Sequence, residues 1–124
     1  MKTLFDSSVL IAHLRGEPQA TSLLLSTTTE ERLASVLSRA EIEGGMRTAE
    51  RARVASLFGV LALLPVTDPI AGRAGEHLRK FRRSHPGIDL VDYLVAATAE
   101  LHGARLATLN VRHFPMVKGL RPPW

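Results

Sequence analysis

Three carboxylates in this sequence stand where a strand is expected to give way to a helix. Asp6 follows the apolar residues 3–5 and precedes the helix-like residues 7–11, while Glu41 and Asp92 each fall near a predicted helix start. In open α/β sheets, ligands bind at the carboxyl ends of the strands. Carboxylates gathered there would hold a hard divalent cation. The types and order of these acids therefore predict a metal-dependent site, although the sequence alone does not show that they converge.

The balance of charge indicates a polyanionic partner. The chain of 124 residues has 16 Lys and Arg against 12 Asp and Glu, a net charge of +4. The excess lies in a main basic cluster (His77, Arg79, Lys80, Arg82, Arg83 and His85) and a smaller group (Arg47, Arg51 and Arg53). Such clusters beside separate acids favour binding of a phosphate backbone, and we predict that Arg79, Lys80, Arg82 and Arg83 contact it. The simpler interpretation is two solvated helix faces.

Composition excludes several other classes of site. The chain has no cysteine, so disulfides and thiolate zinc sites are excluded. No signal peptide is evident, and the apolar residues 57–66 are too short to span a membrane. We therefore expect one domain, residues 1–124, in the cytoplasm, with no membrane partner.

The elements that must position these acids alternate along the chain. The pattern predicts strands at residues 2–5, 32–37, 63–66 and 105–109, and a further strand at 116–120. It predicts helices at residues 7–15, 18–26, 38–46, 49–61, 68–84 and 89–102. Strands separated by helices indicate an α/β fold, with a parallel sheet flanked by helices.

Each acid also has a structural interpretation. Ser38 and Glu41 have the spacing of a capping box, which would fully explain Glu41. Asp6, Asp68 and Asp89 could cap the helices that follow them. Asp92 is different because its helix is apolar on almost every side, and such helices are normally buried. A buried carboxylate is costly unless it is paired or bound to metal, which favours chemistry for Asp92.

The motifs around these acids resemble those of PIN-domain nucleases. The four segments that carry the resemblance are Asp6-Ser7-Ser8-Val9-Leu10-Ile11, Ser38-Arg39-Ala40-Glu41-Ile42-Glu43-Gly44-Gly45, Asp92-Tyr93-Leu94-Val95-Ala96-Ala97-Thr98-Ala99 and Ala107-Thr108-Leu109-Asn110-Val111-Arg112-His113-Phe114. Their order and spacing are similar to those of the VapC-type toxins of bacterial toxin–antitoxin pairs, over essentially the whole chain.

The resemblance implies a PIN-like fold, a Mg²⁺ site that Mn²⁺ could also occupy, and endoribonuclease activity. It further implies a homodimer that a VapB-type antitoxin protein silences. By motif, Asp6, Glu41 and Asp92 are the catalytic acids, and Asp6 and Asp92 contact the metal, with Ser8 beside it. Asn110 stands where many members carry a fourth acid, and Asp89 could supply the missing charge.

Two further expectations concern partners. An antitoxin would insert a basic side chain among the acids, and the apolar stripe Val54-Leu57-Phe58-Leu61 is a candidate docking surface or else part of the core. The main alternative function is a non-catalytic RNA-binding or interaction module in which the acids are helix caps. A receiver domain is disfavoured because no aspartate lies between Asp6 and Asp68, and a haloacid-dehalogenase phosphatase because Ser8 replaces its second aspartate.

Overall fold

The computed structural model describes residues 1–124 and contains one parallel sheet. Its strands are β1 (Thr3–Phe5), β2 (Arg32–Ser35), β3 (Ala62–Leu64) and β4 (Arg105–Ala107), in the order β3-β2-β1-β4. Strands β2 and β3 therefore lie on one side of β1, and β4 pairs with its other side. The strand order reverses at β1, and crevices at such reversals are where open α/β sheets bind ligands. Asp6 directly follows β1.

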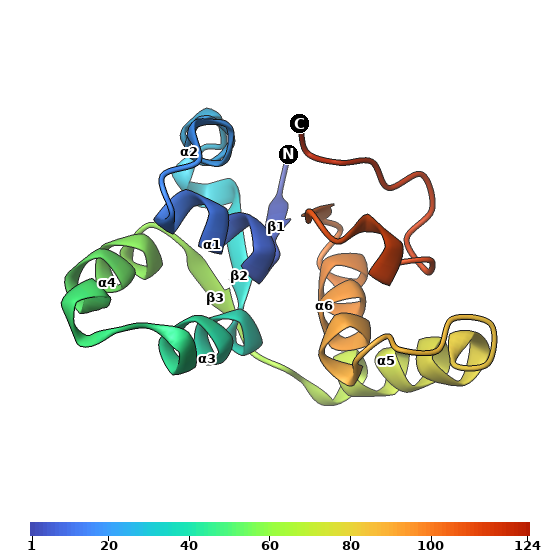
Figure 1. Cartoon of the computed structure of the whole chain (residues 1–124). Coiled ribbons are helices and arrows are strands. Elements are labelled where there is room, and N and C mark those ends of the chain that lie inside the picture. Colours follow the sequence, from blue (N-terminus) through green and yellow to red (C-terminus); the bar gives the residue numbers. More distant parts are fainter.

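Six helices cover the two faces of the sheet (Figure 1). They are α1 (Ser7–Leu14), α2 (Pro18–Ser26), α3 (Val36–Gly45), α4 (Arg51–Gly59), α5 (Asp68–Phe81) and α6 (Leu90–Leu101). Short 3₁₀ turns lie at η1 (Thr29–Glu31) before β2, η2 (Thr48–Glu50) before α4, and η3 (Val111–His113) after β4. Strands separated by helices thus form the parallel α/β fold that the sequence predicts.

Alternation along the strands creates two separate cores. Phe5, Ala34 and Ala107 face one side and pack with helices α1 to α4. Leu4, Leu33 and Leu106 face the other side and pack with Val95, Ala96 and Ala99 of α6. Helix α5 lies outside α6, and their contact buries Ile70, Ala74, Tyr93 and Ala97. Both faces of the sheet are therefore covered, as parallel sheets require.

Several predicted boundaries are wrong. The second strand ends at Ser35, and Val36 and Leu37 belong to α3. Helix α5 ends at Phe81, before the predicted end at residue 84. Residues 116–120 form turns without strand pairing, and Gly119 has a φ of 71°, a left-handed conformation that interrupts an extended segment. The edge of β4 that faces away from β1 therefore has no neighbouring strand.

The apolar stripe on α4 is core. Val54, Leu57, Phe58 and Leu61 are all nearly inaccessible and pack against α1, α2 and α3. The proposal that this stripe docks a partner is therefore wrong, because its side chains already have neighbours within the chain. No helix of the structure combines the length and the apolar character needed to cross a bilayer.

Candidate active site

Asp6 is fixed by the end of β1 and the start of α1. Its backbone N–H donates to Ala107 in β4 at 2.9 Å, and its carbonyl accepts the first helical bonds from Val9 and Leu10. The residue is only 4% exposed. Its side chain makes no capping bond with the helix, although it occupies the cap position. The capping interpretation therefore does not explain why a carboxylate is buried here.

Two hydroxyl groups hold the carboxylate of Asp6. Thr108 donates to Oδ2 at 2.8 Å, and Ser8 donates to the same oxygen at 3.0 Å. Ser8 in turn accepts a bond from the backbone N–H of Leu109, and Thr108 accepts one from that of Asn110, each at 3.0 Å. Both hydroxyls donate to Oδ2, and Oδ1 accepts no hydrogen bond from the protein. The network fixes the carboxylate and leaves one oxygen available to a ligand.

Thr108 is a site residue that the sequence reasoning did not single out. It follows β4 just as Asp6 follows β1, and it is completely buried. A polar residue directly after a buried strand was the available signal. Asn110, by contrast, is exposed and contributes only its backbone N–H to this network.

Glu41 is not a capping residue. The cap of α3 is Ser35, whose side chain accepts a bond from the N–H of Leu37, so the predicted capping box at Ser38 is wrong. Ser38 lies inside the helix, fully buried, with no partner for its hydroxyl. Desolvation raises the pKa of Glu41, interaction with the Ser7 hydroxyl opposes this, and repulsion from Asp6, Asp92 and Asp89 raises the pKa further.

Asp92 lies in the first turn of α6 and is partly buried. Its Oδ2 lies 3.2 Å from Nδ1 of His113. Desolvation is the largest cause that raises the pKa of Asp92; the pairing with His113 opposes it, and the charges of Asp6 and Asp89 add to it. Asp89 precedes the helix, is exposed, and makes no capping bond through its side chain.

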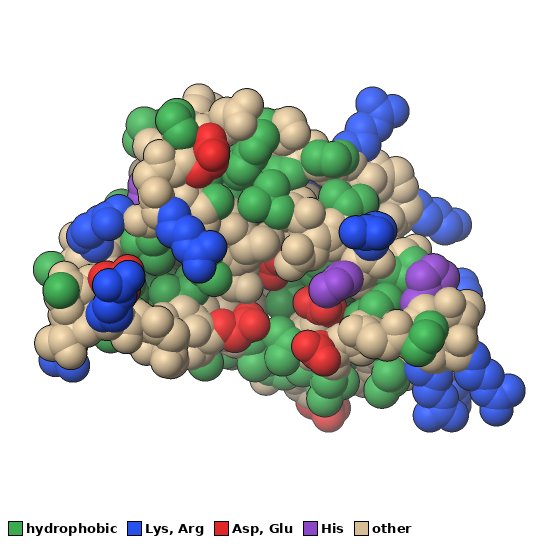
Figure 2. Space-filling view, in the orientation of Figure 1, with side chains coloured by type: hydrophobic (Ala, Val, Ile, Leu, Met, Phe, Trp, Pro, Cys, Tyr) green, Lys and Arg blue, Asp and Glu red, His purple; other side chains and the backbone are tan.

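The mutual effects of these acids on their pKa values show that they lie in one region of the structure. Asp6 comes from the end of β1, Glu41 from α3, and Asp89 and Asp92 from the start of α6. In Figure 2, acidic side chains gather near the middle of the displayed face, with histidine beside them and Lys or Arg toward its edges. Like charges that repel one another raise each other's pKa values or attract a cation.

The acids fit a cation held by one or two carboxylates, and not a cation held directly by three side chains. No three Asp, Glu or His side chains approach closely enough to hold one ion together. The predicted trio of Asp6, Asp89 and Asp92 is therefore not assembled as a set of direct ligands. Mg²⁺, however, is commonly held by one or two carboxylates and completes its shell with water. Oxygen-only donors, mutual repulsion, and the free Oδ1 of Asp6 fit such a cation.

The main basic cluster divides into two parts. Arg79 and Lys80 lie in the last turn of α5, Arg82 and Arg83 follow it, and all four are exposed without an ion-pair partner in the structure. His77 is buried instead, and its Nε2 lies 2.9 Å from Glu100. His77 is therefore a packing residue, whereas the other cations remain available to an anionic ligand.

Asp68 is exposed and outside the acid site, and Thr67 caps α5 in its place.

The smaller basic group is more engaged. Arg47 pairs with Glu50 at 3.8 Å, and Arg53 donates to the carbonyl of Leu14 at 2.6 Å. Arg51 is exposed and makes no side-chain contact of this kind. This group therefore contributes less free positive charge than the end of α5.

Comparison with known proteins agrees with this architecture. The PIN domain family model matches residues 3–119. Ribonuclease VapC10 of Mycobacterium tuberculosis is 53% identical over 122 residues, which cover 98% of this chain and 92% of that protein. Ribonuclease VapC19 of the same organism is 46% identical over 123 residues, 98% of each chain. A solved toxin–antitoxin complex from Klebsiella pneumoniae shares the fold, with a TM-score of 0.84, 22% identity, and coverage of 99% and 98%. The chain belongs to the VapC family of PIN-domain ribonucleases.

Proposed function

We propose that this chain is a Mg²⁺-dependent endoribonuclease and the toxin of a toxin–antitoxin pair. The observation that carries the proposal is the electrostatic coupling of Asp6, Glu41 and Asp92 where the strand order reverses. The relatives named ribonucleases VapC10 and VapC19 support the same reaction class. Helix capping does not account for Asp6, Glu41 or Asp89, which weakens the alternative of a non-catalytic RNA-binding module.

Each acid has a different role in the proposed chemistry. A bound divalent cation supplies Lewis-acid stabilisation of the scissile phosphate and lowers the pKa of a coordinated water. Asp6 offers Oδ1, because Ser8 and Thr108 occupy Oδ2. Asp92 would be the second carboxylate for the ion, and Asp89 would add negative charge nearby. Mn²⁺ has the same preference for oxygen and would serve as a substitute.

Glu41 has the properties of a proton acceptor. Its raised pKa brings its proton affinity closer to that needed for general-base chemistry near neutral pH. Its side chain is exposed at the edge of the site, where substrate and water have access. Arg79, Lys80, Arg82 and Arg83, at and after the end of α5, would hold the RNA backbone. No protein nucleophile is required, in agreement with the absence of cysteine.

Cleavage of RNA by purified protein tests the reaction. We expect a pool of total RNA to be cut in Mg²⁺, to remain intact in EDTA, and to remain intact with Asp6→Asn. Asp68→Asn is the matched control, because Asp68 is an exposed aspartate outside the site and should leave cleavage unchanged. Mapping of the new ends identifies the bond that is cut. RNA binding without cleavage under any metal condition would instead establish the non-catalytic module.

The proposal includes a VapB-type antitoxin as protein partner. The solved toxin–antitoxin complex with the same fold supports this. An arginine of the partner could pair with carboxylate oxygens in the acid site and replace the charge of the cation. Because the α4 stripe is core, the docking surface must lie elsewhere. A cavity of about 530 Å³ between α1, α2 and α4 is bordered by Leu25 and Val60, which are 73% and 43% exposed.

Co-expression tests the partner. Expression of the chain alone should arrest growth, and its genomic neighbour should relieve the arrest and co-purify with it. Leu25→Glu should abolish co-purification and relief, while RNA cleavage in vitro persists. Leu101→Glu, an exposed leucine at the end of α6, is the control and should leave both unchanged. We further propose a cytoplasmic homodimer, which light scattering of the purified protein would test.

A further inference from the structure

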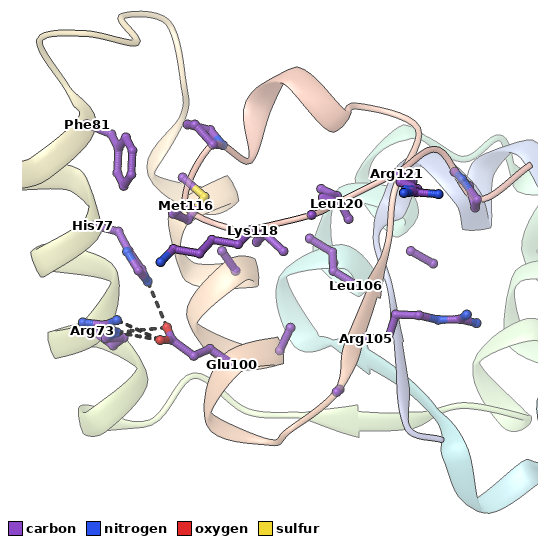
Figure 3. Close-up of a pocket in the computed structure, with 18 of the residues that line it drawn as sticks. Arg73, His77, Phe81, Glu100, Arg105, Leu106, Met116, Lys118, Leu120 and Arg121 are labelled. Carbon is purple, nitrogen blue, oxygen red and sulfur yellow. Dashed lines mark hydrogen bonds and ion pairs between the residues drawn. The ribbon is translucent and has the colours of Figure 1, made fainter.

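A large cavity lies away from the acid site, in the layer formed by α5 and α6. Its walls are these two helices, β4 and the C-terminal residues 115–123, and its volume is about 1070 Å³ (Figure 3). Asp6, Glu41 and Asp92 do not line it. Pockets that bind small molecules usually measure ~300–1,000 Å³, so this cavity is large enough for such a ligand. The proposed chemistry of the acids makes no use of it, and of its lining residues only Arg79 and Lys80 have a proposed role, in holding the RNA backbone.

The charged groups in the cavity separate into a paired set and a free set. Glu100 lies 2.8 Å from Arg73 and 2.9 Å from His77, and Arg73 also pairs with Glu76 at 3.0 Å. The pKa of Glu100 is lowered to about 2 by these partners, so it stays charged and neutralised. The remaining lining cations have no ion-pair partner: Arg79, Lys80, Arg105, Lys118 and Arg121. The cavity therefore carries uncompensated positive charge.

These free cations surround an apolar floor. Ala96 and Ala99 of α6 and Leu106 of β4 line the cavity, and Met116 and Leu120 of the C-terminal segment also line it and pack against this cluster. Figure 3 shows Lys118 extending toward His77, whereas Arg105 and Arg121 lie at the opposite end from α5. The cavity therefore offers an apolar surface bordered by cations.

One aromatic ring stands at the α5 end of this floor. Phe81 lines the cavity, and Nζ of Lys80 lies 5.4 Å from the centroid of its ring. Aromatic faces with neighbouring cations are typical of sites that stack a base and bind its phosphate. Phe81 thus adds a stacking surface to a pocket that already offers positive charge.

We propose that this cavity binds a nucleoside phosphate, with the base on the apolar floor and the phosphate on the free cations. The unit could be a free nucleotide or a nucleotide of an RNA strand, and only the RNA source rests on the proposed ribonuclease function. A second copy of the chain is disfavoured as occupant. A symmetric contact through this face would place free cations against the same cations of the partner. An acidic peptide would satisfy the cations but has no flat group for the floor.

Binding of adenosine monophosphate and of a single-stranded oligoribonucleotide tests the site. Both titrations use the full chain with Asp6→Asn in EDTA, which prevents cleavage, and calorimetry reports affinity. Trp124 is the only tryptophan and ends the segment that walls the cavity, so its fluorescence gives a second readout. Inorganic pyrophosphate and adenosine, tested separately, measure the charge and the base contributions.

Variants separate the cavity from general surface charge. Arg105→Gln and Arg121→Gln change exposed side chains that make no hydrogen bond within the protein, so the fold should persist. Each should weaken nucleotide binding about tenfold, the effect of one lost charge-assisted bond. Arg51→Gln and Arg15→Gln are matched controls, because both side chains are exposed and outside the cavity, and they should leave nucleotide binding unchanged.

The outcomes distinguish a free nucleotide from RNA as the ligand, and either of these from a cavity that binds no nucleotide. Adenosine monophosphate binding that depends on Arg105 and Arg121 supports a free nucleotide, and oligonucleotide binding at least tenfold tighter with the same dependence supports RNA. Absence of binding by both probes would overturn the proposal, as would equal weakening in the control variants or pyrophosphate affinity equal to that of the nucleotide. Binding of an acidic peptide or self-association in place of nucleotide binding would also overturn it. All of these results are independent of whether RNA is cleaved.

Discussion

Replacement of Thr108 by valine should destabilise the protein because it removes a bond to a buried charge. Thr108 is fully buried, and its hydroxyl donates to Oδ2 of Asp6 at 2.8 Å. Valine has nearly the same shape, so the change deletes the hydroxyl with little loss of packing. A hydrogen bond to a charged group contributes ~1.5–3 kcal/mol. We expect Thr108→Val to lower the free energy of unfolding by about 2 kcal/mol, the middle of that range.

The cost should depend on the charge of Asp6. In Asp6→Asn the acceptor is neutral, and a neutral hydrogen bond contributes only ~1 kcal/mol. Thr108→Val should therefore cost roughly half as much in the Asp6→Asn background as in the native chain. Thr108→Ser retains the hydroxyl and is the control for loss of the methyl group. Urea denaturation at neutral pH, in EDTA, measures all five proteins.

Two results would refute this reasoning. If Thr108→Val costs nothing while Thr108→Ser is destabilising, the threonine contributes packing alone. If the cost of Thr108→Val is identical with aspartate and asparagine at position 6, the hydroxyl does not stabilise the charge. In either case the network around Oδ2 would not be what leaves Oδ1 to a ligand.

Three further predictions concern other acids. Because the folded pKa of Asp92 is raised from 3.8, the folded protein loses stability as pH rises through that raised pKa. Asp92→Asn in EDTA should therefore raise the melting temperature at pH 7, and the gain should vanish below pH 3.8; a gain that persists there would contradict the burial of a charged Asp92, and its repulsion by Asp6 and Asp89, as the source. Glu41→Gln should abolish RNA cleavage with an unchanged or higher melting temperature, and a fully active variant would remove Glu41 from the chemistry. Glu100 has its pKa lowered from 4.5 to about 2, so its contribution to stability is present above pH 4.5 and disappears as pH falls toward 2. The melting difference between wild type and Glu100→Gln should shrink over that window, and a constant difference would show that its ion pairs add nothing.

Local patterns predicted most of the elements. The apolar residues 90–101 form a helix that is largely buried, and Pro18 opens α2 as expected for a proline in the first turn. The start of α3 was misassigned because two serines could cap it. The apolar pair Val36-Leu37 suited the end of a strand, but Ser35 accepts the bond from Leu37 and draws both residues into the helix.

Other features depend on contacts that a local pattern does not contain. The α4 stripe has the same spacing whether it faces a core or a partner, and only the packing of α1 to α3 against it shows that it is core. The apolar residues 116–120 resemble a strand, but Gly119 adopts a turn conformation. Thr108 reaches Asp6 only because β4 pairs with β1, a contact between positions 102 residues apart.

The central claim is that the converging carboxylates hold the divalent cation on which RNA cleavage depends. The most direct test titrates Mg²⁺ into one preparation and records the cleavage rate and the melting temperature together. We predict that both rise with the same half-saturating concentration, because the cation that relieves repulsion among the acids is the one that supports cleavage. Asp6→Asn should abolish both responses, while Asp68→Asn should retain both. Full cleavage in EDTA, or a melting temperature that stays constant while activity rises to saturation, would contradict the claim.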